Sequence, residues 1–300
     1  MDDLVLGVNL GVTASGDQLL TAARTAEAAG LDVVTVADHL GSQAPFSVLA
    51  AAAAVTERVR LRTYVLNVFF WNPALLAREA ANVDVISGGR LEVGLGAGHL
   101  RAEHENAGIP FPPHAERVVA LERTMLELRR RLTDPEHTPA PIQREIPLLV
   151  GAWGERSLRV AAEHADIVAL SGLAQVPGRP AGTFTMASAA QTAERVDLLR
   201  VLLTQHRGVE QEAPGLDAIL QFVEVGRDPA EAAGERAAQI SDGATTELLL
   251  DTPFALFART ADDAVDELKR RRDEYGITQW MTHARSATAM MAVARALHGH

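Results

Sequence analysis

An acidic residue and a histidine stand together directly after a buried, strand-like run of this chain. Asp38 and His39 follow the run 32–37, and another histidine, His99, comes shortly after the strand-like run 91–95. An imidazole titrates near neutral pH, and a neighbouring carboxylate can orient it, so the pair suits proton transfer. We therefore predict His39, with Asp38 beside it, as the first catalytic candidate and His99 as the second. The alternatives are a helix-capping aspartate with a structural histidine and, for His99, a loop histidine in solvent.

Small residues follow other strand-like runs, where the backbone can approach a ligand closely. One such turn precedes a helix, and the N–H groups at a helix start can bind phosphate; the alternative there is a tight turn between strand and helix. The residues predicted to hold a cofactor are Asn9, Asp38, Asn67, Gly96, Ala97, Gly98, Gly151, Ala152, Trp153, Ser171 and Gly172. The glycines at 94, 96 and 98 do not predict a dinucleotide-binding motif, because the third is one residue early and no helix begins there.

Two further clusters have competing interpretations. The aromatic run 69–71 is either a packed cap or a platform for a flat ligand, and in a chain with 4% aromatic residues we favour the platform. Glu103, His104 and Glu105 have the residue types of a metal site, but side chains adjacent in sequence rarely converge on one ion. We therefore predict no metal site.

Alternating strand-like and helix-like segments must position these residues. Segment 73–87 begins at a proline and ends at paired glycines, as helices do. Eight alternations indicate a parallel sheet, and 300 residues fit a single-domain, closed (β/α)8 TIM barrel with insertions over residues 1–300. The stretch 241–259 breaks the alternation and is predicted as an insertion or an extra strand. The predicted strands are 4–10, 32–37, 61–66, 91–95, 147–150, 167–170, 218–225 and 277–281.

Composition limits the classes of partner. Hydrophobic residues make up 47% of the chain and charged residues 22%, which is ordinary for a soluble globular protein. The net charge of −11 argues against binding to nucleic acid or to an anionic membrane surface. No apolar run is long enough to span a bilayer, the N-terminus lacks a signal-peptide pattern, and the absence of cysteine excludes disulfides and thiolate chemistry. We expect a cytoplasmic protein that acts on a small molecule.

Three stretches carry a family resemblance: AEAAGLDVVTVADHL, NPALLAREAANVDVISGGRLEVGLGAGHLRAEHENAGIPF and PLLVGAWGERSLRVAAEHADIVAL. They resemble the bacterial luciferase-like superfamily, and within it the actinobacterial oxidoreductases that use the deazaflavin coenzyme F420. The resemblance implies a barrel, a homodimer and a flavin or deazaflavin at the strand ends. It places Asp38 and His39 near the reactive ring, the glycines of 96–98 under its edge and the turn 151–153 at its phosphate. It also implies a non-proline cis peptide near Tyr64-Val65.

The chain departs from its relatives at two places. Some relatives place a proton-donating glutamate just after the fourth-strand glycines, where this chain has His99. The connection 133–146 is too short for the lid strand that relatives usually carry there. A missing lid favours a bulky substrate, such as a peptide or a natural-product intermediate, unless 176–182 or 241–259 closes a small pocket instead.

Three functions follow from the residues and the resemblance. The first is an F420-dependent oxidoreductase, in which the cofactor carries the hydride and the protein handles a proton. The second is an FMN-dependent, two-component monooxygenase on the same fold. The third is a non-catalytic flavin-binding relative.

Overall fold

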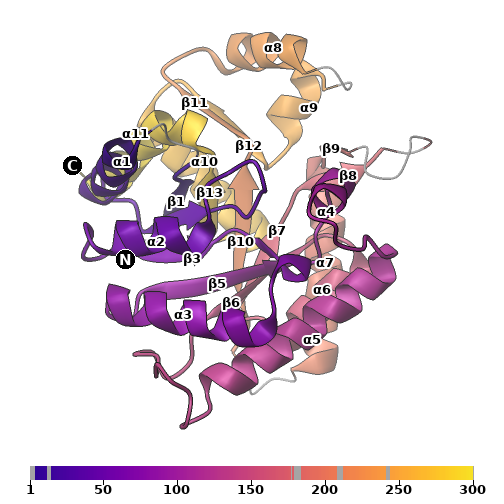
Figure 1. Ribbon diagram of the computed structural model, residues 1–300. Coiled ribbons are helices and arrows are strands. Elements are labelled where there is room, and N and C mark those ends of the chain that lie inside the picture. The colour runs from indigo at the N-terminus through magenta and orange to yellow at the C-terminus, as the bar shows by residue number, and fades with distance from the viewer. Residues whose placement is uncertain are drawn as a thin grey trace.

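Eight parallel strands close into a barrel with helices around it (Figure 1). The computed structural model describes residues 4–11, 15–176, 178, 184–207, 212–240 and 244–299. Each barrel strand pairs with the next one along the chain, and the last barrel strand pairs with the first, which closes the circle. The predicted (β/α)8 barrel is confirmed. Its strands are β1 (Val5–Asn9), β2 (Val33–Val36), β3 (Arg60–Thr63), β5 (Leu91–Gly96), β6 (Leu148–Ala152), β7 (Ile167–Leu170), β10 (Gly215–Leu220) and β13 (Gln279–Thr282).

Helices form the outer layer, and their ends carry the expected capping residues. α3 begins after Asn72, whose side chain accepts a hydrogen bond from the N–H of Ala74, and it ends where Gly88 adopts the left-handed conformation. The helices are α1 (Gly16–Ala28), α2 (Pro45–Ala53), α3 (Pro73–Ser87), α4 (Arg101–Asn106), α5 (His114–Leu132), α6 (Glu155–His164), α7 (Ala189–His206), α8 (Pro229–Gln239), α9 (Thr246–Asp251), α10 (Ala261–Tyr275) and α11 (Ala287–His298), with the 3₁₀ turns η1 (Val68–Phe70) and η2 (Ala284–Ser286).

Two predicted strands are divided. The run 61–66 forms β3 and the short β4 (Leu66–Asn67), separated by the cis peptide Tyr64-Val65 that the resemblance implied. The run 218–225 forms β10 and β11 (Phe222–Val225), because at Gln221 the chain leaves the barrel and its N–H donates to the Phe254 carbonyl at 2.7 Å.

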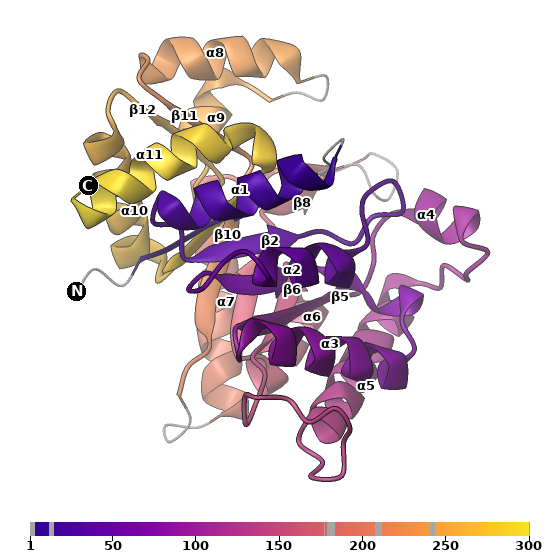
Figure 2. The ribbon, with the colours of Figure 1, turned by 60° about the vertical axis from the view of Figure 1, so that its left-hand side comes forward.

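Extra elements extend the barrel beyond its eight repeats. β11 pairs in parallel with β12 (Ala255–Ala258), so the prediction of an extra strand within 241–259 is correct for its described part. Together with α8 and α9 this pair lies beside the barrel (Figure 2). After β7 comes an antiparallel pair, β8 (Leu173–Gln175) and β9 (Phe184–Met186); the loop 176–182 is described only at residues 176 and 178. Among the described residues, no helix combines the length and apolar character needed to cross a bilayer.

A layer of charged side chains fills part of the barrel interior. Arg62 on β3 is 1% exposed and donates to Glu92 on β5, to Asp217 on β10 at 2.6 Å and to Gln279 on β13 at 2.7 Å. The Tyr64 hydroxyl also donates to Asp217. Burial raises the pKa of Asp217 to about 6, although the Arg62 charge and the Tyr64 hydrogen bond favour the carboxylate. The guanidinium therefore links strands from opposite sides of the barrel.

Replacing Arg62 with methionine should lower the free energy of unfolding by about 3–5 kcal/mol, because two buried carboxylates lose their shared cation. Urea denaturation measures the change, and the deficit should shrink as the pH falls and those carboxylates protonate. Arg78→Met, which removes an exposed pair with Glu79, should cost less than about 1 kcal/mol. Equal, small losses in both variants would show that the layer does not depend on this cation.

Candidate active site

The carboxylate of Asp38 is held by protein donors at the carboxyl end of β2. Its Oδ2 accepts hydrogen bonds from the Trp71 indole Nε1 at 2.9 Å and from the Asn67 N–H at 3.2 Å. Burial raises the pKa of Asp38, whereas these hydrogen bonds and the nearby His39 lower it. Asp38 thus ties the end of β2 to β4 and to the segment that follows it.

His39 is paired with a carboxylate, but that carboxylate belongs to Glu103 and not to Asp38. Nδ1 of His39 lies 2.9 Å from Oε1 of Glu103, which comes from α4, 64 residues along the chain. A carboxylate only accepts, so Nδ1 carries hydrogen and Nε2 is the nitrogen left to exchange a proton. The His39 side chain is 41% exposed and that of Glu103 18%, so the imidazole is the more accessible member.

His99 lies next to this pair. The His39 and His99 rings meet edge to face with centroids 6.1 Å apart. Partial burial lowers the pKa of His99, and the charges of His39 and Arg117 act in the same direction, whereas Glu103 opposes them. The residue as a whole is exposed in a loop, as the alternative interpretation expected. The structure therefore brings both predicted histidines together and favours a neutral His99.

His104 anchors the helix that carries Glu103. It is fully buried, its Nδ1 lies 2.8 Å from the Pro110 carbonyl and its Nε2 lies 2.9 Å from Nδ2 of Asn67. A carbonyl only accepts and an amide NH₂ only donates, so the ring is a neutral imidazole with hydrogen on Nδ1. Since Glu103 contacts His39 and Glu105 lies near Arg101 on the surface, the three residues 103–105 do not converge on one point.

The aromatic run 69–71 packs against protein. The Phe69 and Phe70 rings lie 5.4 Å and 5.6 Å from the His104 ring, and Trp71 meets Phe46 edge to face at 5.2 Å. These contacts correspond to the packed cap, which was the alternative to the ligand platform that we favoured from the sequence. They also hold the side chains of Asp38 and His104 in place.

The small residues after β5 are required by their protein neighbours. A Cβ on Gly96 would lie 2.7 Å from Cγ2 of Val65, and one on Gly98, whose φ is +72°, would lie 2.6 Å from Oδ1 of Asn67. Ala97 between them is half-buried. The groups that approach the backbone closely here are the side chains of Val65 and Asn67, and close approach to a ligand stays a prediction.

The turn after β6 leads to a helix start without a side-chain cap. Gly151 faces Val65, Ala152 is buried, and the Trp153 N–H donates to the Ser157 hydroxyl at 3.3 Å. The N-cap residue of α6 is Gly154, which makes no side-chain cap and has open space where a Cβ would stand. The start of α6 is thus open to solvent and without a side-chain cap, and phosphate binding by residues 151–153 stays a prediction.

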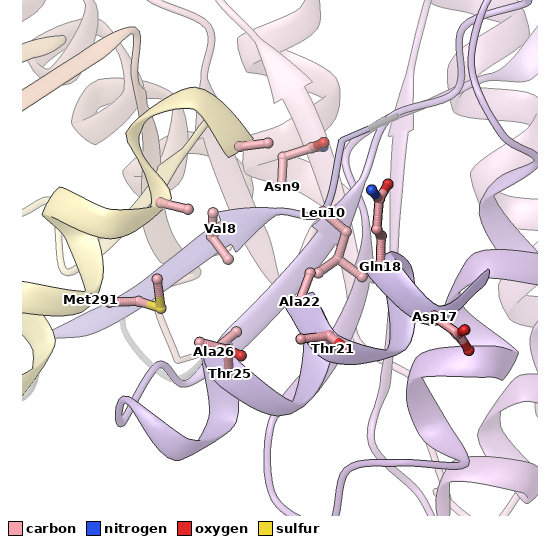
Figure 3. A pocket seen from close by; sticks show the side chains of 12 residues that line it. Val8, Asn9, Leu10, Asp17, Gln18, Thr21, Ala22, Thr25, Ala26 and Met291 are labelled. Atoms are coloured by element: carbon pink, nitrogen blue, oxygen red, sulfur yellow. The ribbon is translucent and has the colours of Figure 1, made fainter. Parts of the chain in front are cut away.

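The remaining predicted residues lie at two other strand ends. After β7, the Ser171 N–H donates to the Ala152 carbonyl at 3.2 Å, and Gly172 packs on Phe254. Asn9 ends β1, where its side chain accepts from the Gly11 N–H at 2.8 Å. Asn9 also lines a mostly apolar hollow of about 450 Å³ between α1 and α11 (Figure 3). None of the catalytic candidates lines that hollow.

Two residues at the strand ends were missed as candidates. Glu103, in the first turn of α4, had been interpreted only as a metal-ligand candidate, although it follows the end of β5 by seven residues. Gln221, where β10 ends, lies with its Oε1 3.0 Å from Nε2 of His283 after β13. Burial lowers the pKa of His283 to about 4, and Arg285 acts in the same direction.

The sequence matches the luciferase-like monooxygenase family over residues 5–300. An uncharacterized protein of Mycobacterium tuberculosis is 30% identical over 242 residues, or 75% of this chain and 74% of the relative. The F420-dependent glucose-6-phosphate dehydrogenase of Kribbella flavida is 34% identical over 145 residues, or 44% of this chain and 43% of the relative. The monooxygenase RslO1 from Streptomyces bottropensis superposes with a TM-score of 0.73 at 23% identity, covering 99% of both chains.

The closed barrel with polar groups at its strand ends is the architecture of a (β/α)8 protein whose site lies at that face. The chain belongs to the luciferase-like monooxygenase family, because the match extends over nearly its whole length. The resemblance drawn from the sequence is thereby confirmed. Its relatives and structural neighbours include both F420-dependent enzymes and monooxygenases.

His283 should make stability fall as the medium becomes acidic. Its folded pKa, about 4, is below the unfolded value of 6.5, so its contribution is present above pH 6.5 and lost as pH falls toward 4. In His283→Gln this part of the pH dependence should vanish, and urea denaturation at neutral pH and at about pH 4.5 measures it. If both proteins lose stability in parallel, the imidazole is not held neutral in the fold.

Proposed function

We propose that this protein is an F420-dependent oxidoreductase that transfers hydride between a deazaflavin and an organic substrate. The observation that carries the proposal is the His39–Glu103 pair at 2.9 Å on the ligand-binding face of the barrel. A hydride transfer to or from a carbonyl or alcohol requires a proton at the oxygen, and this pair can supply or accept it. The relative named as F420-dependent supports the choice of cofactor.

The chain offers groups that fit such a cofactor. The uncapped start of α6 presents N–H groups and the positive end of the helix dipole to a phosphate, with Gly154 leaving the approach open. The glycines at 96 and 98 and the buried Ala152 keep the neighbouring strand ends free of bulky side chains. When bound, a deazaflavin supplies or accepts hydride without activating oxygen as a flavin does.

The residues of the pair have distinct roles in this proposal. Glu103 accepts the Nδ1 hydrogen of His39 and fixes the ring, so that Nε2 gives or takes the proton at the substrate oxygen. Asp38 is a positioning residue, because its contacts to Trp71 and Asn67 hold the end of β2. His99, held toward its neutral form, is the second imidazole that a substrate would meet.

An FMN-dependent two-component monooxygenase is the second candidate function, and the superposition on a monooxygenase favours keeping it. A non-catalytic flavin-binding relative is the third. A homodimer, a cytoplasmic location and a bulky or peptide-like substrate remain predictions. The connection 133–146 contains no strand, and the extra strands that follow β7 and β10 are the pairs β8–β9 and β11–β12.

Side-by-side titration of the apoprotein with F420 and FMN tests the cofactor, and fluorescence reports binding of both. We expect tighter binding of F420 and a turnover that does not depend on oxygen. Gly154→Asp should weaken binding of the phosphorylated cofactor by about 10–100-fold, because a carboxylate would cap the α6 amides and repel the phosphate. Gly154→Ala is the control for side-chain volume.

The phosphate-free analogues separate the outcomes. Binding of riboflavin and of the phosphate-free deazaflavin should be the same in Gly154→Asp as in the wild type. Tighter binding of FMN with oxygen-dependent turnover would replace the first function with the second. An equal loss for phosphorylated and phosphate-free ligands would place the phosphate elsewhere.

His39→Gln and Glu103→Gln test the proton-handling pair. His39→Gln should reduce turnover by about 10²–10⁴-fold while cofactor affinity changes only a few-fold. Glu103→Gln should cause a smaller loss and shift the pH profile of turnover, since it orients the ring without exchanging the proton. Unchanged turnover in His39→Gln would make this histidine structural and His99 the next residue to test.

A further inference from the structure

A second group of imidazoles and carboxylates lies on the outside of the barrel, where α5, α6 and α7 pack side by side (Figure 1). Glu122 comes from the middle of α5, Glu163 and His164 end α6, and His206 ends α7. α6 is about 15 Å long at 1.5 Å per residue, so this group lies one helix length away from Gly154, where the cofactor phosphate is proposed to bind. It is therefore separate from the candidate active site.

The ligating atoms of three of these residues lie at metal-binding separations. Nε2 of His164 is 3.3 Å from Oε1 of Glu122 and 3.7 Å from Oε1 of Glu163. One ligand atom from each of the three lies within 4.8 Å of the others. In a tetrahedral zinc site with bonds of about 2.0–2.1 Å, ligand atoms are about 3.3–3.4 Å apart. An ion bonded to all three atoms would thus need side-chain shifts of only about 1 Å or less.

The charge of the group also favours a cation. Glu122 and Glu163 have ion-pair contacts only with His164 and His206, and across the described ranges no arginine or lysine nitrogen lies within 4.0 Å of either carboxylate. Most other acidic side chains in this region pair with arginine, as Glu127 does with arginines 130 and 131. The two carboxylates therefore share a small space in which, among the described residues, imidazoles are their only ion-pair partners.

The helix ends that present these side chains are fixed. Arg129 of α5 donates to the His164 carbonyl at 3.3 Å and pairs with Asp166 at 2.7 Å. Arg207, just after α7, donates to the Ala162 carbonyl at 2.7 Å. Both guanidinium groups thus bind the last carbonyls of α6 and tie its end to its two neighbours. Such pre-positioning lowers the ordering cost of binding an ion.

We propose that Glu122, Glu163 and His164 form a binding site for a divalent transition-metal ion, with Zn²⁺ as the best fit, which joins α5 to α6. The imidazole selects against Ca²⁺ and Mg²⁺, which prefer oxygen ligands, and three protein ligands leave a fourth position for water. His206, with Nδ1 3.6 Å from the second oxygen of Glu163, is placed to orient that carboxylate. Glu122 and His164 are 42 residues apart, so no local sequence pattern brings these residues together as one group.

Calorimetric titration of the metal-stripped, untagged full-length chain with Zn²⁺ tests the site, together with thermal unfolding at increasing Zn²⁺ concentration. We expect one ion per chain and a Tm that rises with Zn²⁺, because an ion that binds only the folded state stabilises it. Co²⁺ should bind as well and give the intense visible absorption of a four-coordinate ion. Mg²⁺ at the same concentration should leave the Tm unchanged.

Glu122→Gln and His164→Gln should each lower the Zn²⁺ affinity at least tenfold and abolish the Tm rise and the Co²⁺ spectrum. Glu127→Gln is the matched control, since it removes a carboxylate five residues further along α5 and should leave all three readouts unchanged. Equal Zn²⁺ binding in wild type, Glu122→Gln and His164→Gln would place the ion elsewhere and overturn the proposal. So would a Tm that does not respond to Zn²⁺ in the wild type.

Discussion

The buried guanidinium of Arg62 organises the barrel and, through its neighbours, the candidate active site. Arg62 binds Asp217, and Asp217 also accepts the hydroxyl hydrogen bond of Tyr64, the first residue of the cis peptide. The second residue, Val65, then lies across Gly96 and Gly151. The buried charge of Arg62 thus holds the link between β3 and β4 in place through Asp217 and Tyr64. Val65 in this link packs on the carboxyl ends of β5 and β6.

Local sequence patterns predicted the barrel because each strand and helix carries its own signal. The eight strands alternate with helices whose starts and ends are marked by proline, asparagine and glycine, as at Asn72 and Gly88. Where the prediction differed, a contact from far along the chain decided the outcome. The run 218–225 had the composition of one strand, but the Phe254 carbonyl captures the N–H of Gln221 and β11 pairs with β12. Such tertiary contacts leave no periodic trace in the sequence.

The candidate site was predictable in position and less so in pairing. The barrel rule located His39 and His99 at one face, and the structure brings their rings 6.1 Å apart. Adjacency suggested Asp38 as the partner of His39, yet successive side chains after a strand point to different sides. Asp38 therefore meets Trp71 and Asn67, while Glu103, 64 residues away in sequence, meets His39. The glycines of 96–98 and their small neighbours were likewise identified, but the groups they accommodate are Val65 and Asn67.

The partner of His39 is carried by a short helix outside the barrel repeats, so its placement depends on how α4 is held. Six residues form too short a helix to be stable on their own. The adjacent His104 supplies the constraint, because its two ring nitrogens bond to Pro110 and Asn67 and its faces pack on aromatic rings. Asn67 in turn donates its N–H to Asp38. Both members of the proton-handling pair are thus positioned by Asn67, Glu103 through the neighbouring His104 and His39 through the neighbouring Asp38. Buried groups therefore set the distance between His39 and Glu103, while the imidazole of His39 stays accessible.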